Sequence, residues 1–139
     1  MISSRRVVLD ASALLAWILG ERGADTVGKM LPVAVIPVPN LVEVLYRAPE
    51  RGHRMSPTQL MEHVLDMGLA VEPLMPGDVL RAAELIACSR AARDRAGDCL
   101  SLGDGTCLAV AERLGLPVIG GDRLWADLPL AVRFLPFRR

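Results

Sequence analysis

The feature that most constrains the fold is a series of short apolar runs that alternate with segments of helical periodicity. The runs at residues 7–9, 33–36 and 118–119 contain no polar side chain. Strands that are apolar on both sides belong in a sheet that is covered on both faces. Strands alternating with helices favour parallel pairing. The sequence therefore predicts an α/β fold: a three-layer α/β/α sandwich around a central, mainly parallel sheet of about five strands, with further strands at 70–72 and 132–135.

Helical segments fill the intervals between these runs. Leu14, Trp17 and Ile18 share one face of a helix that follows the first strand. Further helices are predicted over 24–31, from 39–40 to 47, and over 107–114. Residues 56–59 read Ser-Pro-Thr-Gln, a strong helix start in which serine caps and glutamine completes a capping box. Another helix should begin near Asp78 and bury its face at positions 79, 83, 86 and 87.

Length and composition indicate one folded domain over residues 1–139. Of the 139 residues, 52% are hydrophobic, which is enough for a core without disulfides. The three cysteines form no C-x-x-C pair, so reduced thiols in a cytoplasmic protein are expected. No run reaches the length of a membrane span, and we expect no membrane contact. The formal net charge is zero, so no global basic field marks a nucleic-acid binder.

Four acidic residues occupy corresponding places beside the predicted strands. Asp10 follows the first strand, Glu43 lies in the predicted first turn after the second strand, and Asp104 opens a helix. Asp122 follows the run at 118–119 by two glycines. Ligands bind beyond the carboxyl ends of parallel strands. Carboxylates that converge there, without histidine or cysteine, favour Mg²⁺ or Mn²⁺, which can activate water for phosphodiester cleavage.

Each acid also has a purely local interpretation. Asp10 and Asp104 could cap helices, and Asn40 with Glu43 could form a capping box. Asp122 could serve a turn. Taken singly, each acid is better explained in this way; the set favours a site. Asp10 weighs most, because a carboxylate placed directly after a buried apolar run is costly unless it is paired or used.

The order and spacing of these motifs resemble the PIN-domain family, specifically the VapC-type toxins, over essentially the whole chain. The stretches that carry the resemblance begin at Val7, Leu41, Leu100 and Leu116, and read VVLDASAL, LVEV, LSLGD and LPVIGGDR. One departure is Gly120, where the family often has threonine or serine. The side-chain hydroxyl two residues before the last acid is therefore missing.

The resemblance implies a PIN-like fold and a metal-dependent endoribonuclease that acts as the toxin of a VapBC-type pair. By this resemblance, one or two Mg²⁺ or Mn²⁺ ions would be held by Asp10, Glu43, Asp104 and Asp122, with Asp10 central. Water activated by the metal would cleave RNA, leaving a 5′-phosphate. Ser12 would orient an acid or a water molecule. The implied partners are RNA, a cognate VapB-type antitoxin and a second copy in a homodimer.

Arginines along the RNA path would have to compensate for the zero net charge. Arg123, beside Asp122, is the favoured RNA contact. Trp125 could stack on a base, whereas Trp17 is expected in the core. One alternative is a catalytically impaired PIN-like module that binds RNA or protein, which Gly120 leaves open. A phosphotransfer domain is a weaker alternative, because Lys29 is the only lysine and lies far from the acids in sequence.

Overall fold

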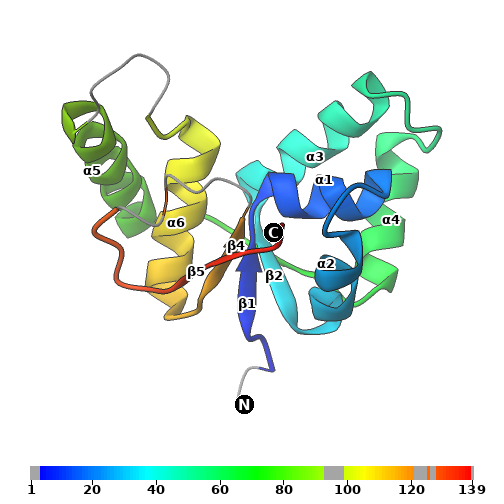
Figure 1. The fold of residues 1–139 in the computed structure, drawn as a ribbon, viewed down its shortest axis with the longest axis horizontal. Coiled ribbons are helices and arrows are strands. Elements are labelled where there is room, and N and C mark those ends of the chain that lie inside the picture. Colours follow the sequence, from blue (N-terminus) through cyan, green and yellow to red (C-terminus); the bar gives the residue numbers. More distant parts are fainter. Residues whose placement is uncertain (1–3, 93–98, 121–124, 126–127, 139) are drawn as a thin grey trace.

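A computed structural model describes residues 4–92, 99–120, 125 and 128–138. Within these residues the sheet has five strands in the order β3-β2-β1-β4-β5, and all adjacent pairs run parallel (Figure 1). The predicted parallel sheet is confirmed, and the central strand is the first in sequence. The strands are β1 (Val7–Leu9), β2 (Ala34–Pro37), β3 (Ala70–Glu72), β4 (Val118–Gly120) and β5 (Phe134–Pro136).

Helices cover both faces of the sheet, which gives the expected three layers (Figure 1). On one side lie α1 (Ala11–Leu19), α2 (Ala24–Met30), α3 (Val38–Glu50) and α4 (Pro57–Asp66), with a short 3-10 turn, η1 (Leu31–Val33). On the other side lie α5 (Pro76–Ala92) and α6 (Leu102–Leu114). Successive β1 residues alternate between the layers: Val7 and Leu9 join one core and Val8 joins the other. This alternation explains why the strand has no polar side.

Two helices differ from their predicted form. Helix α3 begins at Val38 and continues to Glu50, with Pro37 as its N-cap, so Asn40 does not open it. Helix α5 buries Ala82, Leu85 and Ser89, whereas Val79 is 57% exposed. The predicted buried face of α5 is therefore wrong. Apolar residues occur around most of this helix, and only its packing against α6 selects the buried side.

An ion-pair cluster joins α5, α6 and β3 at the far end of α6 from Asp104. Arg113 Nε lies 3.0 Å from both carboxylate oxygens of Asp78, and its Nη2 lies 2.9 Å from Glu72 Oε2. Arg81 Nε lies 2.6 Å from Glu112 Oε1. Asp78 is only 2% exposed. The cluster fixes how the two helices of this layer sit against the sheet. None of the helices in the described part of the chain is long and apolar enough to cross a bilayer.

Candidate active site

Asp10 lies at the carboxyl end of the central strand and is the N-cap of α1. Its Oδ1 accepts a hydrogen bond of 2.8 Å from the Ala13 backbone N–H. The Ser12 hydroxyl lies 2.8 Å from each Asp10 oxygen. Asp10 is 4% exposed, so backbone and hydroxyl together fix a nearly buried carboxyl group. The contact with Ser12 is the one expected of a residue that orients this acid.

Burial raises the pKa of Asp10 from 3.8 to about 7. The hydrogen bonds from Ala13 and Ser12 lower the pKa but do not offset the loss of hydration. The negative charges of Asp104 and Glu43 raise it further. These two acids, which come from different helices, therefore lie close enough to Asp10 to act on it electrostatically. A bound cation would reverse the effect by favouring the charged carboxylate.

Glu43 is the sixth residue of α3 and lies in its second turn, not its first. Because α3 is capped at Pro37, the predicted capping box between Asn40 and Glu43 is not formed. The carboxylate instead pairs with Arg47 one turn later, with Nε 3.1 Å from Oε2. The side chains of Glu43 and Arg47 are 24% and 45% exposed. Glu43 is thus partly accessible and carries its own counter-charge.

Asp104 is the third residue of α6, and Ser101 is the N-cap. The Ser101 hydroxyl accepts a hydrogen bond from the Asp104 backbone N–H at 3.1 Å, and Asp104 Oδ2 accepts one from the Ser101 N–H at 3.3 Å. Asp104 therefore completes a capping box and does not cap the helix itself. This local role places the carboxylate at the start of α6, at the same edge as Asp10.

Three of the four predicted ligands thus occur in the described part of the chain at one edge of the sheet. Within the part of the chain that the structure describes, however, no three side chains of histidine, cysteine, aspartate or glutamate are placed so that they could hold a metal ion. Asp122 and Arg123 lie outside the described residues. The three acids fit a hard divalent cation by donor chemistry, since all are carboxylates.

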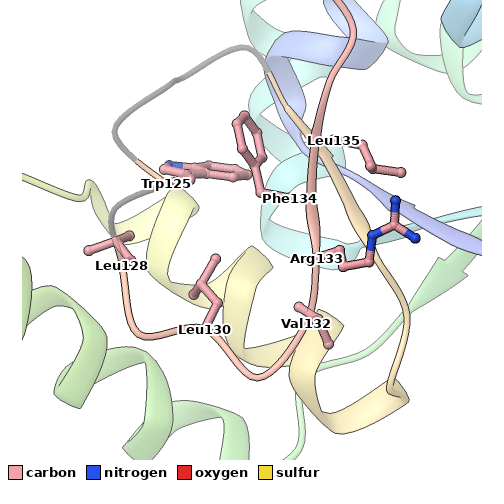
Figure 2. A pocket seen from close by; sticks show the side chains of 7 residues that line it. All are labelled: Trp125, Leu128, Leu130, Val132, Arg133, Phe134 and Leu135. Carbon is pink, nitrogen blue, oxygen red and sulfur yellow. The ribbon is translucent and has the colours of Figure 1, made fainter.

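Gly120 packs directly against Asp10 and Trp125. A Cβ atom at this position would lie 2.9 Å from Asp10 Oδ2 and 2.7 Å from Trp125 Cζ3. Trp125 is fully buried and meets Phe134 edge-on, with ring centroids 5.6 Å apart. Figure 2 shows it at one end of a pocket lined also by residues 128, 130 and 132–135. A threonine or serine would not fit beside this indole, which explains the departure at Gly120.

The two tryptophans differ in how well they match the sequence interpretation. Trp17 packs against the core and stacks on His63 with ring centroids 5.2 Å apart, as expected of a core residue. Trp125 has no exposed surface. It is therefore not available to stack on a base in this structure, and that prediction is wrong. The indole instead belongs to the core cluster that contains Val8 and Leu108.

Two residues near the acids were missed from the sequence. Cys107 is fully buried, and its thiol lies 3.7 Å from the Leu9 carbonyl. Burial, and then the charges of Asp10, Asp104 and Glu43, hold the pKa of this thiol well above its usual value. It remains protonated and is not a nucleophile. Asn40 is 1% exposed and bonds across to α6. Neither contact has a local signal, because the partners are far apart in sequence.

A family model described as PIN domain matches residues 7–129. No curated protein matches the sequence. Solved structures with similar folds include a toxin–antitoxin complex from Klebsiella pneumoniae, at 19% identity and a TM-score of 0.67 over 88% of this chain and 92% of the other.

Two further structures share the fold. DNA-bound VapBC from Salmonella typhimurium is 18% identical, with a TM-score of 0.67 over 96% of this chain and 98% of the other. VapC20 from Mycobacterium tuberculosis, described as a sarcin-ricin loop cleaving toxin, is 18% identical, with a TM-score of 0.65 over 91% and 98%. At these identities the likeness establishes the fold alone.

Proposed function

Because the chain belongs to the PIN domain family, we propose that it is a metal-dependent endoribonuclease and the toxin of a VapBC-type pair, built as one domain over residues 1–139. The observation that carries this proposal is Asp10: a nearly buried carboxyl group whose pKa is raised to about 7 at the end of the central strand. Such a group is costly to a fold that makes no use of it. A divalent cation would offset that cost.

In this proposal Asp10, Glu43, Asp104 and Asp122 hold Mg²⁺ or Mn²⁺. The ion, when bound, supplies an activated water and stabilises the charge that develops on the phosphate. Ser12 holds Asp10 in place through both of its oxygens. The capping box of α6 holds the backbone at Asp104. Glu43 would contribute its partly exposed carboxylate, which pairs with Arg47 in this structure.

The partners follow from the same family. We propose an RNA substrate with Arg123 on the phosphate path, a VapB-type antitoxin and a homodimer, acting in the cytoplasm. The solved toxin–antitoxin and VapBC structures with this fold support an antitoxin partner. An exposed apolar row on α3, made by Val38, Val42 and Tyr46 (40%, 55% and 51% exposed), lies on the same helix as Glu43. An apolar segment of a partner would find its contact there.

The proposal is tested by cleavage of a mixed RNA substrate with Mg²⁺, with Mn²⁺ and with EDTA. We expect cleavage with either metal and none with EDTA. Asp10→Asn should abolish cutting, because a neutral amide binds a divalent ion poorly. It should not unfold the protein, since the amide oxygen can still accept the Ala13 N–H. Asp25→Asn, an exposed acid in the first turn of α2, is the matched control and should cleave normally.

A second candidate is a PIN-like module that binds RNA or protein without cleaving. The observation that favours it is Gly120, where the usual hydroxyl is replaced by the contact with Trp125. RNA that binds the folded wild type, yet stays intact with every metal, would support this second function and remove the first.

A further inference from the structure

Asn40 lies at the junction between the helices that carry Glu43 and Asp104. It is the third residue of α3 and is 1% exposed. Its Nδ2 donates a hydrogen bond of 3.1 Å to the carbonyl of Gly103, 63 residues along the chain. Gly103 directly precedes Asp104 in the first turn of α6. A single side chain therefore links the beginnings of the two helices.

Stability alone does not account for this amide. The Gly103 carbonyl also accepts a hydrogen bond of 3.0 Å from Thr106 Oγ1, so it has a donor without Asn40. Within the described part of the chain, Asn40 Oδ1 is buried and has no hydrogen-bond partner. A buried oxygen without a donor destabilises a fold. An apolar side chain of similar size would serve the packing at least as well.

The same junction also contains the Glu43 carboxylate. A Cβ atom on Gly103 would lie 2.9 Å from Glu43 Oε1 and 3.7 Å from Asn40 Nδ2. The amide, the carboxylate and the Gly103 backbone therefore surround one small volume. The hydrogen bond from Asn40 fixes how closely the first turn of α6 approaches Glu43, and hence where Asp104 stands.

We propose that Asn40 is a positioning residue that sets the separation of the Glu43 and Asp104 carboxylates for a divalent cation. This inference rests on the proposed function, because it assumes that these acids hold the ion. It assigns the contact between α3 and α6 a role in the site beyond core packing.

The test compares Mn²⁺ binding and thermal stability in Asn40→Leu and the wild type, with Mn²⁺ alone as the probe in isothermal titration calorimetry. We expect the affinity for Mn²⁺ to fall by about tenfold or more, the size of effect seen when a residue that orients a metal ligand is replaced. The melting temperature of the metal-free protein should stay the same or rise, because the unpartnered oxygen is removed. A purely structural role predicts the opposite pair of results.

A second variant alters the same junction while Asn40 itself is kept. Gly103→Ala should push the Glu43 carboxylate aside and weaken Mn²⁺ binding, while alanine suits the helix. The matched control is Gly77→Ala, the second position of α5 as Gly103 is of α6, where an added Cβ meets nothing within 4 Å. Its Mn²⁺ affinity should equal that of the wild type.

The outcomes separate the two proposals. Wild-type Mn²⁺ affinity in folded Asn40→Leu overturns the role of Asn40. So does wild-type affinity in Gly103→Ala if Asn40→Leu fails to fold. A wild type that binds Mn²⁺ but cleaves no RNA overturns the nuclease function. The role of Asn40 is then decided by the Mn²⁺ affinities of the variants alone. A wild type that binds no Mn²⁺ overturns both.

Discussion

The carboxyl group of Asp10 combines two demands that oppose each other in the absence of a cation. As an N-cap it stabilises α1 by accepting the Ala13 N–H. As a nearly buried acid it resists ionisation, and its pKa rises to about 7. A bound cation would reconcile the two demands, because it would compensate the charge of the ionised carboxylate while that group still accepts the Ala13 N–H. Stability and activity at this residue should therefore depend on pH in linked ways.

For the metal-free protein, the sign of the pH dependence follows from this shift. The folded pKa of about 7 exceeds the reference value of 3.8, so the folded state binds a proton that the unfolded state has lost. The stabilising contribution is complete below pH 3.8 and is lost as pH rises through 7. A shift of this size corresponds to about 4 kcal/mol at most.

Other acids titrate as well, so the measurable quantity is a difference. In EDTA, the free energy of unfolding of Asp10→Asn minus that of the wild type should increase between pH 4 and pH 8. Denaturant unfolding at several pH values measures it. A difference that stays constant over this range contradicts the raised pKa. Mn²⁺ at pH 8 should then stabilise the wild type more than the variant.

Gly120 illustrates what sequence reasoning could not reach at the residue scale. The missing hydroxyl was visible in the sequence, but its cause was not. The crowding comes from Trp125, which approaches Gly120 of β4 and meets Phe134 of β5 edge-on. By contrast, the placement of Asp10 was predictable, because a strand followed by a helix fixes where the residue between them must lie.

At the scale of elements, two helices begin with the same device. Both α4 and α6 open with a serine N-cap in a complete capping box, Ser56 with Gln59 and Ser101 with Asp104. The first box was predicted from sequence, and the second was not. In the second box the carboxylate that supports the cap is also a candidate ligand, and this joins helix stability to the site.

Removing each serine should separate these roles. Ser56→Ala and Ser101→Ala should each lower the free energy of unfolding by about 1 kcal/mol, since each loses a cap. Only Ser101→Ala should also slow RNA cleavage, by about tenfold, because the turn that holds Asp104 loosens. Denaturant unfolding and initial cleavage rates measure the two effects. Equal cleavage rates in the two variants would refute the link between this cap and the site.

Helices and strands were predictable where a local sequence pattern determines them. They were not predictable where contacts between elements distant in sequence determine the buried face. Alternation of apolar runs and helices was enough for the parallel sheet. Strand limits moved by one or two residues, as for β5, which begins at Phe134 and not at Val132. The face of α5 was mispredicted because apolar residues occur on several sides of it. The crossing contact from Asn40 to Gly103 has no sequence signal at all.

At the scale of the whole molecule, the two ends of α6 have different roles. Its first turn bears Asp104, and its last turn bears Arg113 in the ion-pair cluster with Asp78 and Glu72. Asp104 and Arg113 are nine positions apart, which spans roughly 14 Å of helix. The cluster should therefore stabilise the layer of α5 and α6 without acting on the chemistry.

Asp78→Ala tests this separation. Arg113 would lose a buried partner while keeping Glu72, so the free energy of unfolding should fall by about 2 kcal/mol, as for the loss of a charged hydrogen bond. Below its melting temperature the variant should cleave RNA at the wild-type rate. Glu84→Ala is the control: its side chain is 67% exposed and its carboxylate lies 3.9 Å from Arg81 Nη1, so its loss should change little. A slower folded Asp78→Ala enzyme would show that the two ends are coupled.

The central position of β1 has a consequence for synthesis on the ribosome. The backbone N–H of Asp10 donates to the carbonyl of Ile119 at 3.1 Å, although 109 positions separate the two residues in the chain. A nascent chain emerges from its N-terminus, so β1 must wait for β4 before its second edge is paired. Until then the edge of the sheet beside Glu43 on α3 and Asp104 on α6 is incomplete. A translation product that stops before residue 118 would contain Asp10, Glu43 and Asp104 but not β4, so β1 would be paired along one edge only.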